Sequence, residues 1–215
     1  MDLFKGFTKE DFDVFKIDGL EARMDGIRER IQPSFQAIAD EVVPTLSTIA
    51  GDEFFTHIAQ HARRKVNPPN DTWVAFAANK RGYKMMPHFQ VGLYESHLFI
   101  WFAVIYEAQV KSSFANQLLT DVSKWKQTIP GNFSWSLDHM KPETLKHEDL
   151  TEEDLKEMFV RLRDVKKAEL LCGVTIDRND PILIDGPALT SKIEETFKTV
   201  FPLYQESQKV HSMTT

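Results

Sequence analysis

Seven side chains that could bind a small ligand lie within, or shortly before, the segment His88–Glu107. This segment predicts a β-hairpin that turns at Glu95–Ser96, and side chains opposite one another would share a face of the sheet. One face then carries imidazole, amide, phenol and indole groups, and two cations precede it. Apolar surface with a few converging polar groups is typical of a ligand pocket, and the cations favour an anionic ligand. The predicted site residues are His88, Gln90, Tyr94, His97, Trp101, Arg81 and Lys84.

The same face also has a purely structural interpretation. Gly92 faces Phe99 in this register, and the missing side chain would leave room for a ring or for a ligand. His88 and Tyr94 could be tied to backbone atoms on a partly hydrated sheet. A slip of one residue in either strand would exchange its two faces.

His57 and His61 offer a second kind of chemistry. They are spaced i, i+4 in the segment Glu53–Lys65, which is predicted to be helical. That spacing places both imidazoles on one helix face, where they could share a metal ion with a further ligand. The zinc-metalloprotease motif requires Glu directly after the first His, and Ile58 stands there instead. A metal-dependent hydrolase is therefore one alternative, and a solvated helix face is the other.

Two segments carry concentrated charge. Basic residues from Arg63 to Lys84 are interleaved with aromatic rings and could hold a phosphate or a nucleotide. The acidic segment Glu143–Glu157 could balance these cations within the fold, or it could bind a basic partner as a protein-interaction module. The net charge of −6 makes nucleic acid a disfavoured general partner.

Recognisable catalytic motifs are absent from the sequence. It contains no phosphate-binding glycine loop and no nucleophile elbow. Cys172 is the single cysteine, and its apolar neighbours predict a buried, inert thiol. Asp138 and His139 could form an acid/base pair with a distant partner, but neighbouring residues on a predicted strand point to opposite faces. No catalytic residue or cofactor is therefore predicted.

These side chains need a sheet and helices to position them. Strands are expected at Thr72–Ala78, in the hairpin, at Phe133–Asp138 and at Ala168–Ile176. Helices are expected at Lys9–Phe15, from Asp18, from Pro33, at Glu53–Lys65, at Gln109–Ile129, after Thr151 and at Ala188–Phe201. The pattern predicts an α+β fold with a central, mostly antiparallel sheet of about five strands, an N-terminal helical third and helices packed on the sheet. Residues 1–205 are expected to form a single domain, and residues 206–215 a frayed tail.

Composition is typical of a folded, soluble protein. Of the 215 residues, 42% are hydrophobic and 27% are charged, and sixteen phenylalanines supply an aromatic core. The opening residues lack a signal sequence, and the longest apolar run, Leu98–Tyr106, is too short to span a bilayer. No membrane association and a cytoplasmic location are therefore expected.

Two long blocks are specific enough to compare with known families: FTKEDFDVFKIDGLEARMDGIRERIQP and NPPNDTWVAFAANKRGYKMMPHFQVGLYESHLFIWFAVIYE. They resemble the YktB-like family of Gram-positive bacteria over nearly the whole chain. This resemblance implies a compact α+β domain in a bacterial cytoplasm and assigns no catalytic residue. Our leading hypothesis is a non-enzymatic binding or regulatory domain for a small anionic ligand.

Overall fold

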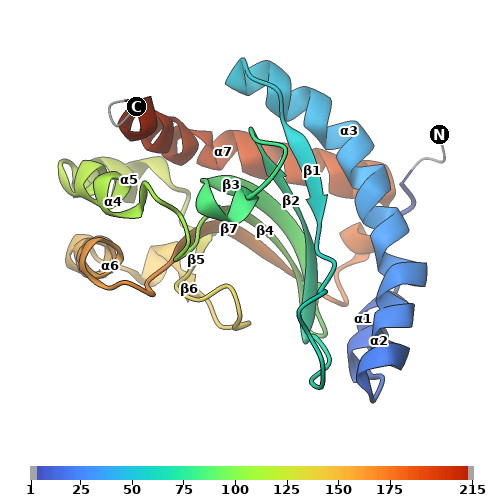
Figure 1. Ribbon diagram of the computed structural model, residues 1–215. Coiled ribbons are helices and arrows are strands. Elements are labelled where there is room, and N and C mark those ends of the chain that lie inside the picture. Colours follow the sequence, from blue (N-terminus) through green and yellow to red (C-terminus); the bar gives the residue numbers. More distant parts are fainter. Residues whose placement is uncertain (1–3, 213–215) are drawn as a thin grey trace. The chain divides into compact units, whose positions relative to one another are not determined.

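The computed structural model describes residues 4–212 as an α+β protein with one seven-stranded sheet (Figure 1). The strands are β1 Phe55–Ile58, β2 Asp71–Ala77, β3 His88–Tyr94, β4 His97–Val104, β5 Ser134–Ser136, β6 Leu145–Lys146 and β7 Leu170–Asp177. Their order in the sheet is β1-β2-β3-β4-β7-β5-β6, and the β1–β2, β5–β6 and β5–β7 pairs are antiparallel. The prediction of about five strands is wrong because the short strands at both edges, β1 and β6, were not predicted.

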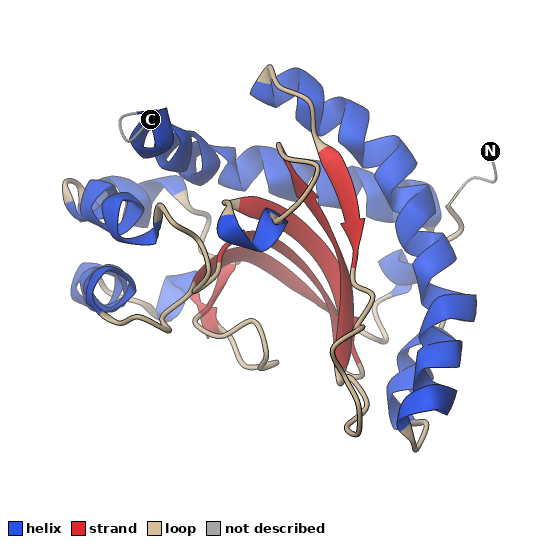
Figure 2. Ribbon diagram, in the orientation of Figure 1, coloured by secondary structure: helices blue, strands red, loops and turns tan. Residues whose placement is uncertain are grey.

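Helices account for most of the remaining regular structure (Figure 2). The α-helices are α1 Lys9–Asp13, α2 Leu20–Gly26, α3 Gln32–Ala50, α4 Lys111–Leu119, α5 Val122–Thr128, α6 Glu152–Asp164 and α7 Gly186–Ser212. Single-turn elements are η1 Val14–Lys16, η2 Ile27–Ile31, η3 Tyr83–Met85, η4 His147–Asp149 and η5 Pro181–Ile184.

The chain forms two compact units, each assembled from several segments. Unit 1 extends to Lys80 and also includes Gln90–Ile100 and Thr175–Glu195. Unit 2 contains Arg81–Phe89, Trp101–Val174 and the chain from Thr196 onward. The single domain expected from the sequence stays a prediction, and the two units are described separately below.

Unit 1 begins with the helices that the sequence predicts. The Thr8 amide and hydroxyl both donate to the Asp11 carboxylate, so a capping box starts α1. Helix α3 buries an apolar stripe that includes Phe35, and it packs on β1 and β2 (Figure 1). Gly51 caps its C-terminus in the left-handed conformation, with φ of 68°. The ring of Phe7 meets Phe35 edge-on with the centroids 6.0 Å apart, which anchors the entry to α1 on α3.

The helix predicted at Glu53–Lys65 is wrong, and the N-terminal third is helical only as far as Ala50. Phe55–Ile58 instead pairs with β2, and His57 lies opposite Ala75. Aromatic and β-branched residues favour a strand here, and the neighbouring β2 supplies the hydrogen-bonding partner. Pairing with β2 therefore overrides a local spacing that is compatible with a helix.

In unit 2, the predicted helix Gln109–Ile129 is divided into α4 and α5. Asp121 interrupts it, because its carboxylate accepts a hydrogen bond from the Lys124 amide at 2.9 Å and caps α5. Helix α6 packs on α4 and α5, and begins with a second capping box between Thr151 and Asp154 (Figure 1). The core includes Phe89, whose ring centroid lies 4.9 Å from that of Phe197 on α7.

Helix α7 is longer than predicted. The sequence places its end near Phe201, whereas the helix continues to Ser212 through residues expected to be frayed, and residues 213–215 lie outside the described part. Its first residues belong to unit 1, and the chain from Thr196 belongs to unit 2. Among the helices of residues 4–212, none combines the length and the apolar character needed to cross a bilayer.

Candidate functional site

The predicted hairpin is confirmed, and the space beside its glycine, Gly92, is occupied by a protein side chain. Strands β3 and β4 flank Glu95–Ser96 as expected. A Cβ at Gly92 would overlap the Phe99 ring, so the space opposite Gly92 holds this ring. The alternative use of this space, for a ligand, would require the Phe99 side chain to move.

Three of the predicted ligand-binding residues lie in unit 1. Gln90 and Tyr94 are buried, and the Tyr94 ring lies 5.2 Å from the His97 ring and 5.6 Å from the Phe99 ring. Burial lowers the pKa of His97, and the negative charge of Asp177 opposes that shift. The structure thus brings Tyr94 and His97 into contact within a packed aromatic group.

The other four predicted residues lie in unit 2. His88 is fully buried, and its Nδ1 donates to the Met86 carbonyl at 2.8 Å, as the structural interpretation expects. The Tyr83 ring meets the His88 imidazole edge-on at 5.1 Å. Trp101 is buried in β4, whereas Arg81 is exposed and Lys84 is half-buried in η3. A ligand site formed by all seven residues stays a prediction.

His57 and His61 do not share a helix face. The Nε2 atom of His57 donates to the Asn79 carbonyl at 2.9 Å from strand β1. His61 follows in a loop with φ of 50°, and its Nε2 lies 3.1 Å from the Thr72 hydroxyl. The prediction that both histidines lie on one helix face and so share a metal ion is therefore wrong in its geometry. Metal binding by these histidines stays a prediction.

The acidic segment Glu143–Glu157 is mostly exposed, as an interaction surface would require. One of its carboxylates has a structural task, because Asp154 accepts hydrogen bonds from the Thr151 amide and hydroxyl. That this segment docks a basic partner stays a prediction.

Unit 1 contains a polar cavity that the sequence did not reveal. Its volume is about 460 Å³, and its walls come from α2, the following η2 and the loop after β1. The lining residues are Leu20, Glu21, Met24, Asp25, Arg28, Gln60, His61, Ala62 and Arg64. The cavity includes Arg64 from the basic segment Arg63–Lys84, for which anion binding was one of two interpretations of the sequence.

A buried arginine fixes the frame of this cavity. Arg23 lies on α2, and its Nε donates to the Ile17 carbonyl while Nη1 donates to the Pro69 carbonyl, both at 2.9 Å. Gln32 on α3 donates to the Ala59 carbonyl at 3.2 Å, beside the loop that carries His61. These hydrogen bonds connect segments far apart in the sequence, which explains why periodicity alone did not predict the cavity.

Charges of both signs line the cavity. Arg28 Nη1 lies 3.1 Å from an Asp25 carboxylate oxygen, and both side chains are exposed. Arg64 donates to the carbonyls of Asn67 and Pro68 at 3.3 and 3.4 Å, which holds its guanidinium on the loop. Arg28 and Arg64 could bind a carboxylate or phosphate through their paired N–H groups.

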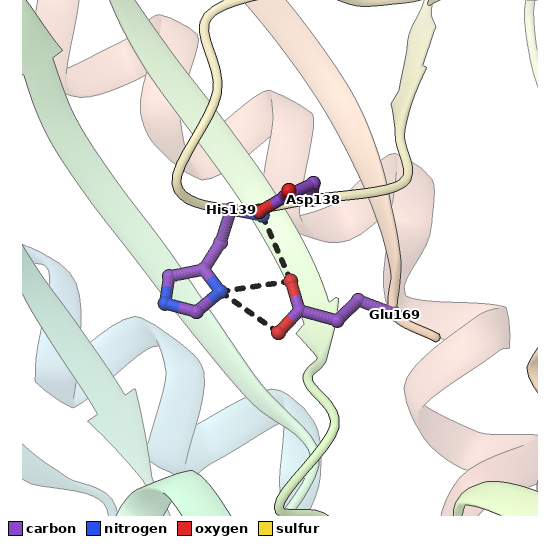
Figure 3. A group of neighbouring side chains, drawn as sticks. All are labelled: Asp138, His139 and Glu169. Atoms are coloured by element: carbon purple, nitrogen blue, oxygen red, sulfur yellow. Dashed lines mark hydrogen bonds and ion pairs between the residues drawn. The ribbon is translucent and has the colours of Figure 1, made fainter. Parts of the chain in front are cut away.

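Unit 2 contains a group of titratable residues that the sequence interpretation dismissed (Figure 3). Strand β5 ends at Ser136, so Asp138 and His139 lie in a turn and strand alternation does not separate them. The distant partner is Glu169, which lies just before β7 and is 4% exposed. An acidic residue directly before an apolar strand was the signal that could have identified it.

Comparison with known proteins places the chain in a family. The relatives include UPF0637 proteins of Bacillus velezensis, at 48% identity, and Bacillus licheniformis, at 46%, each over 95% of this chain and 97% of the relative. A UPF0637 protein of Bacillus cereus is 48% identical over 92% of this chain and 95% of its own. The model of a domain of unknown function, DUF1054, matches residues 7–204, and the chain therefore belongs to the DUF1054 family, in agreement with the resemblance to proteins of Gram-positive bacteria.

Proposed function

We propose that this protein binds a small ligand with an anionic group in the polar cavity of unit 1. The observation that carries this proposal is the convergence of Arg28, Arg64, His61 and Gln60 from two separate segments around one cavity of about 460 Å³. That volume falls within the range of small-molecule sites, and arginine is well suited to carboxylates and phosphates.

The acidic residues of the cavity narrow the ligand class. Glu21 and Asp25 would repel a compact polyanion but would accept hydrogen bonds from ammonium or hydroxyl groups. The favoured ligand therefore combines one anionic group with such donors, as amino acids and hydroxylated acids do. Its anion would compete with Asp25 for Arg28.

The backbone at His61 supports a binding role. His61 occupies the left-handed region, which costs a non-glycine residue roughly 1–2 kcal/mol. The surrounding structure holds it there, with the Trp73 ring meeting the imidazole edge-on at 5.5 Å. Strain of this kind is concentrated at ligand sites, where it fixes a side chain in a required direction.

A thermal-shift screen tests the proposal with amino acids, hydroxylated carboxylates and phosphate monoesters as probes. A ligand that binds only the folded state should raise the melting temperature, and the rise should grow with the logarithm of the ligand concentration above its Kd. Arg28→Gln and Arg64→Gln should each weaken binding of the best probe about tenfold or more, because each removes a charged hydrogen-bond donor.

Arg163→Gln is the matched control, because Arg163 lies in unit 2 and pairs with Asp164 at 2.7 Å. It should leave probe binding unchanged. Probes that stabilise both cavity variants as strongly as the unaltered protein would place the site elsewhere. A screen without any stabilising probe would contradict a binding role for this cavity.

A further inference from the structure

We propose that Asp138, His139 and Glu169 form a binding site for a divalent transition-metal ion in unit 2. One ligand atom from each residue can be chosen so that all of these atoms lie within 4.8 Å of one another. His139 Nδ1 lies 2.9 and 2.8 Å from the two carboxylate oxygens of Glu169 (Figure 3). Atoms at this separation can both reach a metal ion that lies about 2.1 Å from each of them.

The two carboxylates are held in place by backbone donors. The His139 amide donates to Glu169 Oε2 at 2.8 Å, and the Tyr106 amide donates to Oε1 at 3.3 Å. The Met140 amide donates to Asp138 Oδ1 at 2.9 Å. Carboxylates that bind metals are usually oriented by such hydrogen bonds, which reduces the entropy lost on binding.

The positive charges nearby still allow a cation to bind. Lys141 Nζ lies 3.7 Å from Asp138 Oδ2, but the Lys141 side chain is 68% exposed and can turn into solvent. Lys111 interacts electrostatically with Glu169, yet its Nζ donates to three carbonyls, of Val165, Lys166 and Ala168, and is held by them. The two carboxylates can therefore balance a divalent ion after one flexible lysine moves.

The chemistry of the side chains indicates which metals suit the site. One imidazole with two carboxylates favours manganese, iron or zinc over calcium, which prefers oxygen ligands alone. Three protein ligands leave coordination positions for water or a substrate. Asp138 also lines a cavity of about 340 Å³ in unit 2, so one ligand lies beside a space that small molecules can enter.

Isothermal titration calorimetry of EDTA-treated, untagged protein with zinc, manganese and magnesium chloride tests this site. We expect one saturable site that binds zinc or manganese at least tenfold more tightly than magnesium. Asp138→Asn and His139→Gln should each weaken that binding at least tenfold. Circular dichroism will confirm that both variants are folded, and Glu169→Gln serves as a third variant if it folds.

Glu143→Gln is the matched control, because Glu143 is exposed and lines the same cavity as Asp138 but does not belong to the group. It should bind metal as the unaltered protein does. Equal affinities in the control and in His139→Gln would overturn the proposal, and so would the absence of zinc and manganese binding. His139 and Glu169 would then form an ion pair that fixes the turn to the start of β7.

Discussion

At the scale of single residues, His147 couples the stability of unit 2 to pH. It is buried, its Nδ1 accepts a hydrogen bond from the Trp135 indole at 2.9 Å, and its Nε2 donates to the Lys126 carbonyl at 3.0 Å. A proton on Nδ1 would face the indole N–H donor. Burial lowers the pKa of His147 below its usual value near 6.5.

The stability that neutral His147 contributes is therefore present above about pH 6.5 and is lost as the pH falls towards its lower folded-state pKa. We predict that the free energy of unfolding decreases between pH 7 and pH 5. His147→Gln should reduce that decrease, because glutamine can make similar hydrogen bonds without titrating. Denaturant unfolding followed by tryptophan fluorescence measures both effects.

His57 and His97 also have lowered pKa values, so part of the pH dependence of stability should persist in His147→Gln. An unchanged dependence in His147→Gln would contradict this role.

Gly92 is the residue at which the hairpin tolerates no side chain. A Cβ there would overlap the Phe99 ring and lie 2.6 Å from the Thr72 carbonyl oxygen, which belongs to the backbone. We predict that Gly92→Ala lowers the free energy of unfolding by about 1–3 kcal/mol, the usual cost of overpacking. Chemical denaturation measures this cost, with Gly131→Ala as the control because its Cβ would meet Glu148 at an ordinary 3.4 Å. Equal effects of both substitutions would show that Phe99 can move aside.

The surroundings of Gly92 and Cys172 were easier to predict than contacts between residues far apart in the sequence. The sequence correctly indicates that Gly92 faces Phe99 and that Cys172 is buried, where burial raises the pKa of its thiol. It could not indicate that Glu169 meets His139, since 30 residues separate them and only the paired strands bring them together. Contacts of this kind depend on tertiary structure and leave no periodic signal.

At the scale of elements, Lys111 stabilises the end of α6. Its side chain is buried, and its ammonium donates to three carbonyls between Val165 and Ala168 at 2.6 to 3.2 Å. These carbonyls belong to the cap residue Val165 and to the loop that follows α6. A cation beside the C-terminus of a helix also interacts favourably with the helix dipole. Burial lowers the pKa of Lys111, and Glu169 opposes that shift.

Lys111→Met should therefore lower the free energy of unfolding by about 2–3 kcal/mol, because it leaves three buried or partly buried carbonyls without a charged donor. Lys156→Met is the control on α6, since Lys156 is exposed and pairs with Glu153. Its effect should stay within about 0.5 kcal/mol in the same urea titration. A Lys111→Met protein as stable as the control would mean that water replaces the ammonium at no cost.

Elements with local signals were predicted well, and elements defined by a partner were not. Two capping boxes, at Thr8 and Thr151, and the turn at Glu95–Ser96 are encoded within a few residues, and the structure contains them. Strands β1 and β6 are four and two residues long. Such short edge strands become recognisable only when the neighbouring strand supplies their hydrogen bonds, so a helix was expected in place of β1.

At the scale of the whole molecule, the sequence predicts an α+β protein with a mostly antiparallel sheet, and the described residues form an α+β protein with an antiparallel sheet. It does not predict the two compact units, because each contains segments from distant parts of the chain and no linker separates them. Composition and a net charge of −6 limit the partners but identify no ligand. The ligand class proposed above rests on the polar cavity of unit 1 and not on composition.

The central claim is that a small ligand with one anionic group and hydrogen-bond donors binds between α2 and the loop after β1 within unit 1. Titration of isotope-labelled protein with serine, which combines one carboxylate with ammonium and hydroxyl donors, followed by backbone amide chemical shifts, tests it most directly. We predict saturable shifts at millimolar serine that are largest at residues 20–28 and 60–64, and that are lost in Arg64→Gln. Largest shifts at Gln90, Tyr94 and His97, or shifts that Arg64→Gln does not alter, would contradict the account.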